Sequence, residues 1–537
     1  LARKIDPTRI ILDESGGFAD GANFYLPYQN TATKFNDIHN YPGWRVFENW
    51  ISAFEGVGLD EEEKKLRNLA IKGPGNNVVP GLPVFLSEIG YGSIPDFQKT
   101  NTIFKQQGNP LTATYRDHME LEKAYNQALI ESGFDKQYRT VSELATLQHN
   151  FHGRLNRRML EGARINPLLS GYCVHALCGG DWVLGAGLID IWRNPKGAVY
   201  TETAKANQER ILVMRANPRN LYSGEQIHLE TFIVNELDNF SGYLIISLES
   251  DDGTKFWTKN ENIKVNHGIN ISDKIDIPSD ELIGKYFIKG LLKDNKGKII
   301  YESTIPVNIY DSSSIYVKKN LYVLESNNRL ANYLNNKGIS FDNYSNQTGG
   351  RGLIIVGQLN NKSDNFISKL EKVKEFVRSG GNALYLDYKG KFIIDRKSRK
   401  LPEKQLSDKF PIGMAIINTN GLWQSTIHML KDHPLFEGIT NNDHMDEVFE
   451  KVGPTKSFFM PEGEIIAGVI STDRYPNQDN MQRHFIGVGD VWYASDLSEI
   501  KFGDGLLVPT TLNILNHLGK DPVADKLFFN MINYYGK

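Results

Sequence analysis

The residues that most directly indicate chemistry are Ser87 and Glu88, which follow the apolar run Val84–Leu86 and precede a Gly-Tyr-Gly sequence. This pattern is typical of a short buried strand whose carboxyl end presents one carboxylate beside an open loop. In a (β/α) barrel, strand ends of this kind carry catalytic residues. A carboxylate there indicates chemistry on an acetal centre such as a glycosidic bond. The alternative is a strand that ends at the water boundary and is followed by a simple turn.

Two further segments are dense in polar and aromatic side chains at the ends of strand-like runs. One follows Phe35 and ends in a Pro-Gly turn, and the other surrounds the glycine pair Gly179–Gly180. Singly, each has a plainer explanation, since a histidine in an apolar run is more often a core residue than a catalyst. Jointly, the segments predict a polar pocket able to bind a sugar. The candidate residues are Asp37, His39, Asn40, Tyr41, His175, Asp181 and Trp182.

Composition excludes several classes of partner for this chain of 537 residues. The net charge of −3 is too small to indicate a nucleic-acid or anionic-membrane partner, and no 18-residue apolar stretch is present. The only cysteines, Cys173 and Cys178, and the scattered histidines show no zinc spacing, so no metal or cofactor is expected. Cysteine usage leaves the compartment open, and a periplasmic or secreted location is compatible with it.

Residues 1 to about 208 alternate strand-like and helix-like segments, which indicates parallel β/α architecture. Four strands would make half of an eight-stranded barrel and would leave sheet edges uncovered. Since the chain also begins at Leu1 in what reads as the tail of a helix, we expect a fragment of a longer protein. The predicted strands are Arg9–Leu12, Lys34–Ile38, Val84–Leu86 and Gly171–Ala176; the predicted helices are Asp60–Ala70, Tyr115–Glu131 and Val141–Glu161.

The remaining sequence divides into two parts. Residues 209–312 contain short alternating runs bounded by turn signals, which predict an immunoglobulin-like β-sandwich. Residues 315–537 return to alternation and predict a doubly wound, flavodoxin- or amidotransferase-like α/β domain. No cysteine follows Cys178, and Thr348–Gly352 precedes a strand instead of following one, so neither a thiol nucleophile nor a dinucleotide loop is indicated. We expect this last part to be non-catalytic, although a ligand of its own stays open.

Four motifs together resemble the second half of the catalytic barrel of glycoside hydrolase family two, which includes β-galactosidases, β-mannosidases and β-glucuronidases. Their order and spacing resemble strands five to eight of that barrel. The following sandwich fits the family's usual next domain, and Asp432–Gly438 resembles an amidotransferase-like module of some large members. The four motifs are Asp6–Arg9, Asp37–Gly43, Ser87–Gly90 and Gly187–Lys196.

The resemblance implies a role for each matching residue. Glu88 would be the nucleophile that forms a glycosyl-enzyme, and Tyr41 would orient it. His39 and Asn40 would lie beside the sugar, with Asp37, Tyr91, His175, Asp181 and Trp182 as further substrate contacts. The family commonly has a Trp at the end of strand eight, where this chain reads Tyr172–Ala176, so the identity of the sugar is in doubt.

The family's acid/base glutamate follows an Asn at the end of strand four, which would precede Leu1. The leading hypothesis is therefore a retaining exo-β-glycosidase, β-galactosidase-like by default, whose upstream half-barrel comes from the same polypeptide or a second chain. The expected substrate is an oligosaccharide or glycoside, and a homodimer is plausible. The alternative is a non-catalytic carbohydrate-binding or assembly protein derived from a glycosidase.

Overall fold

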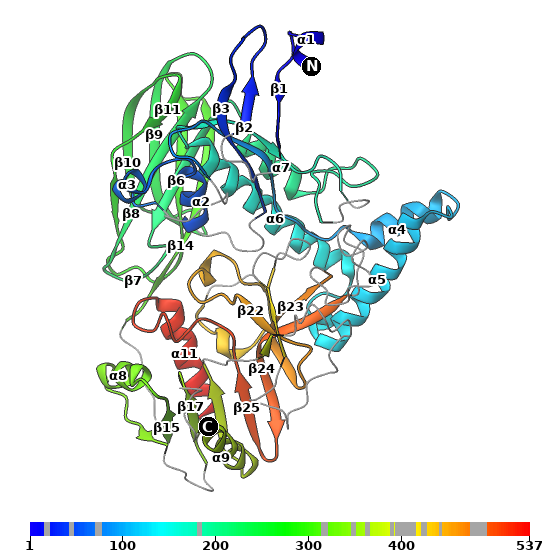
Figure 1. Cartoon of the computed structure of the whole chain (residues 1–537). Coiled ribbons are helices and arrows are strands. Elements are labelled where there is room, and N and C mark those ends of the chain that lie inside the picture. The colour runs from blue at the N-terminus through cyan, green and yellow to red at the C-terminus, as the bar shows by residue number, and fades with distance from the viewer. Residues whose placement is uncertain are drawn as a thin grey trace.

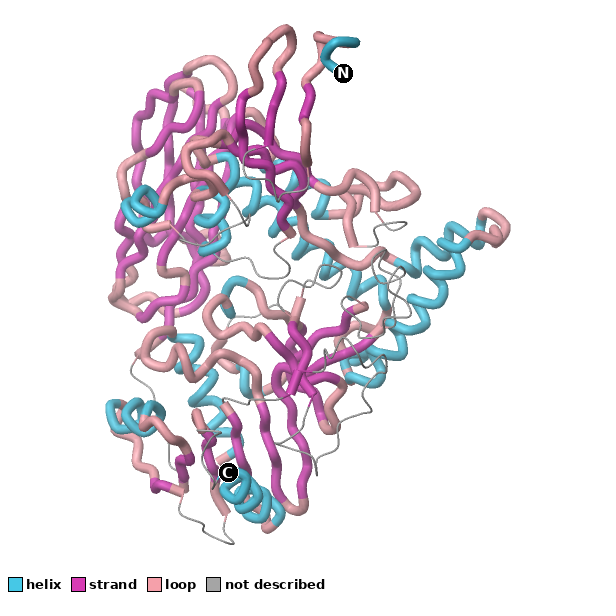
Figure 2. The backbone as a smooth tube through the Cα atoms, viewed as in Figure 1, coloured by secondary structure: helices cyan, strands magenta, loops and turns pink. Residues whose placement is uncertain are grey.

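The chain folds as a mixed α/β protein of several parts, each built around its own sheet (Figure 1). Figure 2 shows the strands gathered in separate groups, with helices between and around them. The computed structural model describes residues 1–15, 22–41, 48–69, 78–179, 185–312, 320–344, 351–359, 366–386, 391–392, 415–419, 427–439, 443–472 and 491–536.

The first sheet has the strand order β1-β2-β3-β4-β5. Strands β3, β4 and β5 are parallel neighbours, whereas β2 pairs antiparallel with both β1 and β3. The four predicted strands therefore run in the same direction, but the first does not pair directly with β3 because β2 lies between them. The links 13–21 and 26–32 are shorter than the roughly dozen residues that a parallel crossover needs, so the chain folds back through the unpredicted β2. The strands are β1 Ile11–Leu12, β2 Ala22–Tyr25, β3 Thr33–Asn40, β4 Val84–Ile89 and β5 Leu169–Val174.

Helices pack against this sheet, and the predicted helices are confirmed as α3, α5 and α6. The long α6 begins where the Thr140 side chain accepts a hydrogen bond from the Glu143 amide, a standard N-cap. Its apolar positions recur at helical spacing and are buried in the same core cluster as Val84 and Leu86 of β4. The helices are α1 Ala2–Ile5, α2 Glu48–Glu55, α3 Glu61–Leu66, α4 Phe97–Gln106, α5 Ala113–Ser132, α6 Val141–Arg164 and α7 Ala198–Ala206, with a 3₁₀ turn at Phe134–Lys136.

The second part is a sandwich of two antiparallel sheets, apart from one parallel pairing between β7 and β14. One sheet has the order β10-β9-β13-β14-β7, and the other joins β11, β8, β12 and β6. Inward-facing side chains of both sheets form one apolar cluster, as the alternating burial along β13 predicts. The strands are β6 Arg210–Asn217, β7 Asn220–Tyr222, β8 Gln226–Asn235, β9 Phe240–Ser250, β10 Lys255–Val265, β11 Gly268–Ile271, β12 Ile275–Pro278, β13 Gly284–Asp294 and β14 Ile299–Tyr310.

The third part contains a sheet whose main path is β16-β15-β17-β18-β25-β24-β22-β20-β19, with β21 and β23 attached through β24. The strands from β16 to β25 are parallel, as predicted, but β24, β22, β23 and β21 pair antiparallel. The prediction of a doubly wound sheet over all of residues 315–537 is therefore wrong. A tight turn at Gly503, whose φ is 65°, joins β24 directly to β25 and forces the reversal.

The elements of this third part follow in chain order. They are β15 Leu321–Leu324, α8 Arg329–Asn336, β16 Asp342–Asn343, β17 Leu353–Val356, α9 Phe366–Arg378, β18 Asn382–Tyr385, β19 Lys391–Phe392, β20 Ala415–Asn418, β21 Met429–Leu430, β22 Lys456–Phe459, β23 Glu464–Ser471, β24 Trp492–Phe502, β25 Gly505–Pro509 and α11 Pro522–Tyr535, with 3₁₀ turns at Pro434–Phe436 and Glu447–Phe449.

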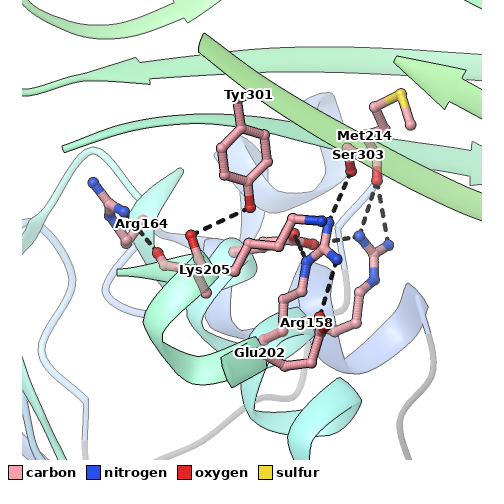
Figure 3. A network of polar contacts seen from close by, with 10 residues as sticks. Arg158, Arg164, Glu202, Lys205, Met214, Tyr301 and Ser303 are labelled. Carbon is pink, nitrogen blue, oxygen red and sulfur yellow. Dashed lines mark hydrogen bonds and ion pairs between the residues drawn. The ribbon is translucent and has the colours of Figure 1, made fainter. Parts of the chain in front are cut away.

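Helix α6 joins the first part to the other two. Toward the sandwich, the fully buried Glu161 accepts hydrogen bonds from Arg157 and Arg158, and Arg158 also donates to the Met214 carbonyl of β6 (Figure 3). Toward the third part, Arg154 lies 3.2 Å from the His444 ring nitrogen. The first sheet is thus held on a helix whose own position is fixed by polar contacts on two sides.

Candidate functional site

Glu88 lies at the carboxyl end of β4 between two histidines from the neighbouring strands. Its Oε2 is 2.9 Å from Nδ1 of His39, which pairs with Glu88 in the β3–β4 register. Its Oε1 is 3.4 Å from Nε2 of His175, which follows β5 directly. The three side chains are about 20 to 30% exposed, so the carboxylate is held from both sides and remains open to solvent.

Tyr41 completes the set of groups around this carboxylate. Burial raises the pKa of the Tyr41 hydroxyl well above its ordinary value, and the hydrogen bond to Glu88 and the charge of Glu88 raise it further. The phenol therefore stays protonated and donates to the carboxylate. Its ring also packs edge-on against His175, with 5.9 Å between the ring centroids. The Glu88 site is defined here as Glu88, His39, His175 and Tyr41.

Local strand geometry explains why Glu88 faces these partners. The β3–β4 pairing runs from Asp37 opposite Phe85 to His39 opposite Glu88, so β4 gains one residue over β3 in this interval. An extra residue of this kind re-aims the side chains that follow it, and bulges recur beside active sites. Within the bulge, the Ser87 hydroxyl donates to the Asp37 carboxylate, which fixes the two strands at this point.

The chain after Glu88 approaches β5 very closely. The His175 amide donates to the Ile89 carbonyl at 2.8 Å, and a Cβ added at Gly90 would lie 2.6 Å from the His175 carbonyl oxygen. Only glycine fits at such a distance. Gly90 therefore allows the histidine to come within reach of the carboxylate.

The other predicted contacts have different outcomes. The Asn40 side chain is partly buried at the end of β3, and its Oδ1 is buried without a hydrogen bond to any described residue. Asp37 is 2% exposed and bonded to Ser87, and Tyr91 is 1% exposed in the apolar core. Neither the Asp37 nor the Tyr91 side chain is thus open to solvent, and their roles as substrate contacts stay predictions. Asp181 and Trp182 lie outside the described residues.

Sequence reasoning missed the residues that hydrogen-bond to the loop after β4 and so support the Glu88 site. The loop after β4 is held by side chains of α6 and by Lys196, whose Asn-Pro-Lys context gave no distinctive signal. Gly90 was visible only as part of a turn. The signal that identifies these residues is three-dimensional, since it lies in which backbone atoms they contact.

The described residues contain no group of three or more His, Cys, Asp or Glu side chains arranged to hold a metal ion. None of their helices is long and apolar enough to span a bilayer. What the arrangement offers is an accessible carboxylate oriented by three hydrogen-bonding groups. Such a group can act as a nucleophile toward an electrophilic carbon or as a general base.

No protein-family model matches the chain, and a search of curated proteins gives no significant match. Among solved structures, it is similar to a β-D-mannosidase from Dictyoglomus thermophilum at 18% identity, over 53% of this chain and 31% of that chain, with a TM-score of 0.33. It is also similar to the Amycolatopsis orientalis exo-chitosanase in complex with PNP-β-D-glucosamine, at 16% identity over 54% and 32% of the two chains, with a TM-score of 0.32.

A third similar structure is the Bacteroides uniformis β-glucuronidase, at 11% identity over 33% of this chain and 27% of that chain, with a TM-score of 0.17. All three proteins are glycosidases by name. This chain matches about a third or less of the length of each of them.

Proposed function

We propose that this chain carries the nucleophile side of a retaining exo-β-glycosidase site, with Glu88 as the attacking carboxylate. The observation that carries the proposal is the position of Glu88 at a strand end, open to solvent, with His39, His175 and Tyr41 around it. The nearest functional assignment for such a carboxylate is attack on an anomeric carbon.

The proposed reaction proceeds in two displacements. Glu88 attacks the anomeric carbon and forms a glycosyl ester, while an acid protonates the departing oxygen of the aglycone. The acid, which has now lost its proton, then acts as a base and removes a proton from a water molecule. This water attacks the anomeric carbon and releases Glu88. His39 and Tyr41 hold the carboxylate in one orientation, so attack begins from a prearranged geometry.

The acid/base residue is not among the direct partners of Glu88 in the described part of the chain. In that part, the polar partners of Glu88 are His39, His175 and Tyr41, none of which is a carboxyl group. Retaining hydrolysis needs a second carboxyl roughly 5–5.5 Å from the first. We assign this role to another stretch of the same polypeptide or to a partner chain that completes the barrel.

The specificity for the sugar depends on the groups that surround Glu88. β-Galactoside hydrolysis is the default activity, and His175 stands where the resembling family has an aromatic wall. An imidazole beside the carboxylate offers a hydrogen-bonding group in place of a stacking surface. We therefore propose a glycone recognised by hydrogen bonds to Asn40 and the histidines.

The test replaces Glu88 with Gln in the whole polypeptide that contains this chain. Turnover of an aryl β-glycoside is expected to fall at least about a thousand-fold, because amide oxygen is a poor nucleophile. The matched control is Glu62→Gln on the exposed face of α3, which should leave turnover unchanged. Near-normal activity of the Glu88→Gln protein would exclude the assignment.

A second candidate is a non-catalytic carbohydrate-binding protein derived from a glycosidase. The absence of a second carboxyl among the described partners of Glu88 favours it. Calorimetry separates the two candidates, since a binding protein takes up a β-glycoside without releasing aglycone. In that case Glu88→Gln would preserve or increase the measured affinity.

A further inference from the structure

The loop after the nucleophile strand is held by one face of α6. Asn156 Oδ1 accepts a hydrogen bond from the Tyr91 amide at 3.1 Å, and Gln148 Oε1 accepts one from the Ile94 amide at 2.9 Å. Between them, the His152 ring nitrogen lies 2.9 Å from the Ser93 hydroxyl. These helix residues are four apart and share one face, so a single rigid helix fixes the loop at successive points.

Lys196 holds the same loop from the other side. Its nitrogen lies 3.2 Å from the Ser93 carbonyl oxygen, 3.4 Å from that of Ala186 and 3.5 Å from that of Gly185. The Ser93 amide also donates to the Gly185 carbonyl at 2.8 Å. One amine thus joins the loop after β4 to the chain segment that follows β5.

Among the described residues, Lys196 forms no direct ion pair, although the residue is only 6% exposed. Burial lowers its pKa to about 7, partly offset by the charge of Asp190 and by Cys178. From α6, His149 and His152 face it, and burial lowers the pKa of both rings, so they stay neutral. A buried amine without a carboxylate is unfavourable for stability, and sequences keep such groups chiefly where function requires them.

We propose that Lys196 is a positioning residue of the Glu88 site, which ties the loop after β4 to the segment after β5. The proposal rests on the proposed function of Glu88. The hydrogen bonds explain how a loss of Lys196 would displace the Glu88 carboxylate. Ser93 is separated from Glu88 by a short stretch held to α6, and the Leu188 amide donates to the Ala176 carbonyl next to His175. Loosening this tie would shift Glu88 and His175 relative to each other.

A neighbouring lysine provides a matched control. Lys99 and Lys196 both line a cavity of about 290 Å³ between α4, α6 and the 190–197 segment. The Lys99 side chain is exposed on α4 and makes no hydrogen bond or ion pair with either loop among the described residues. Replacement of Lys99 with Met therefore removes a lysine from the same cavity without breaking the tie.

The experiment compares Lys196→Met and Lys99→Met in the whole polypeptide by hydrogen exchange of the Ser93 and Leu188 amides, together with kcat/KM on an aryl β-glycoside. For Lys196→Met, exchange at Ser93 should rise at least about ten-fold, because the bonds from a charged donor are lost. Displacement of the nucleophile should lower kcat/KM by about ten- to a hundred-fold. Lys99→Met should change neither quantity.

A second variant separates positioning from general damage to the fold. In Lys196→Ala, added n-propylammonium should restore both Ser93 protection and kcat/KM, whereas n-propanol, which has the same shape without the charge, should not. If the Lys196 variants do not fold, Ser93 protection in the unmodified protein, corrected for intrinsic exchange, should rise about ten-fold between pH 6 and pH 8, because an opening that exposes the Lys196 amine takes up a proton.

The outcomes distinguish the two proposals. Unchanged Ser93 exchange in Lys196→Met, or protection that is flat with pH in the unmodified protein, overturns the role of Lys196. If Ser93 exchange changes but Glu88→Gln keeps normal activity, the tie exists and the function proposed for Glu88 is wrong. If Ser93 exchange rises but kcat/KM does not fall, Lys196 is structural and does not position the site.

Discussion

At the scale of single residues, the site depends on one close approach between backbones. Glu88 can meet His175 because Gly90 leaves room for the His175 carbonyl oxygen. Tyr41 then contacts both the carboxylate and the imidazole ring. Each of these contacts uses a strand end, where the backbone has just left the sheet.

Replacement of Gly90 with Ala should therefore disturb activity more than folding. The added Cβ would lie 2.6 Å from the His175 carbonyl oxygen, so His175 must move away from Glu88. We expect kcat/KM on an aryl β-glycoside to fall about ten- to a hundred-fold, as for other small misplacements of reacting groups. Gly108→Ala is the control, since it strains only its own backbone, whose φ is 86°, and its Cβ meets nothing within 4 Å. It should leave kcat/KM unchanged, and equal losses of kcat/KM in the two variants would contradict the explanation.

At the scale of elements, α6 both supports the site and contacts the sandwich. One face of α6 supports the loop after β4, and Arg158 contacts the sandwich by donating to the Met214 carbonyl (Figure 3). Arg157 and Arg158 both pair with Glu161. Because Glu161 is fully buried and pairs with two guanidinium groups, its loss takes a buried carboxylate from both arginines at once, although Arg157 also pairs with Glu202.

Replacement of Glu161 with Gln should lower the free energy of unfolding by about 3–5 kcal/mol, since it breaks a buried ion pair on one side only. The urea unfolding transition measures this change. Glu62→Gln on the exposed α3 should shift the transition by less than about 0.5 kcal/mol. Comparable shifts in the two proteins would show that the cluster contributes no more than a surface carboxylate.

The buried Lys196 amine should make the free energy of unfolding depend on pH. Burial lowers its pKa from the ordinary 10.5 to about 7 in the folded protein. Between these two pH values the unfolded chain binds more protons than the folded protein. The free energy of unfolding of the unmodified protein, measured against that of Lys196→Met, therefore rises with pH by about 1.4 kcal/mol per pH unit. Below pH 7 the difference is constant.

The comparison is made with Cys178 replaced by Ser in both proteins, because its thiol faces the amine, while Asp190 and the neutral His149 and His152 are left in place. Urea transitions at pH 7, 8, 9 and 10 give the slope. A difference that stays flat over this range would mean that the folded lysine keeps its proton, contrary to the burial argument.

Much of the site could be predicted at the element scale, and the failures have physical reasons. Glu88 was visible because apolar Val84–Leu86 gives way abruptly to polar residues, and parallel pairing brings His39 beside it. Strand β2 has no strong periodicity and was missed. Asp37 looked like a ligand contact, but a bulge and Ser87 bury it. Lys196 is recognisable only from carbonyl groups that lie far from it in sequence.

At the scale of the whole molecule, charged groups join the three parts of the chain. Glu447 belongs to the third part and lies 4.0 Å from Arg154 of α6, and Arg219, between β6 and β7, acts on it from the sandwich. Burial alone would raise the pKa of Glu447, but Arg154 and Arg219 outweigh it and lower the pKa to about 2. The carboxylate is thus charged wherever the protein is folded at ordinary pH.

This junction predicts the response to acid. Because the folded pKa of about 2 lies below the ordinary 4.5, Glu447 contributes stability above pH 4.5 that is lost as pH falls toward 2. Glu447→Gln should lower the free energy of unfolding at pH 7 by on the order of 3 kcal/mol, and the deficit should shrink below pH 4. A deficit that is the same at pH 3 and pH 7 would show that the charge is not the cause.

The central claim is that Glu88 forms a covalent bond to the sugar, and trapping tests it most directly. The whole polypeptide is incubated with a 2-deoxy-2-fluoro-β-glycoside carrying a good leaving group, and the proteolytic peptides are weighed. We predict one added fluoroglycosyl unit on the peptide that contains Ser87 and Glu88, lost in Glu88→Gln. Labelling of a different carboxylate, or turnover of substrate without any label on this peptide, would contradict the account.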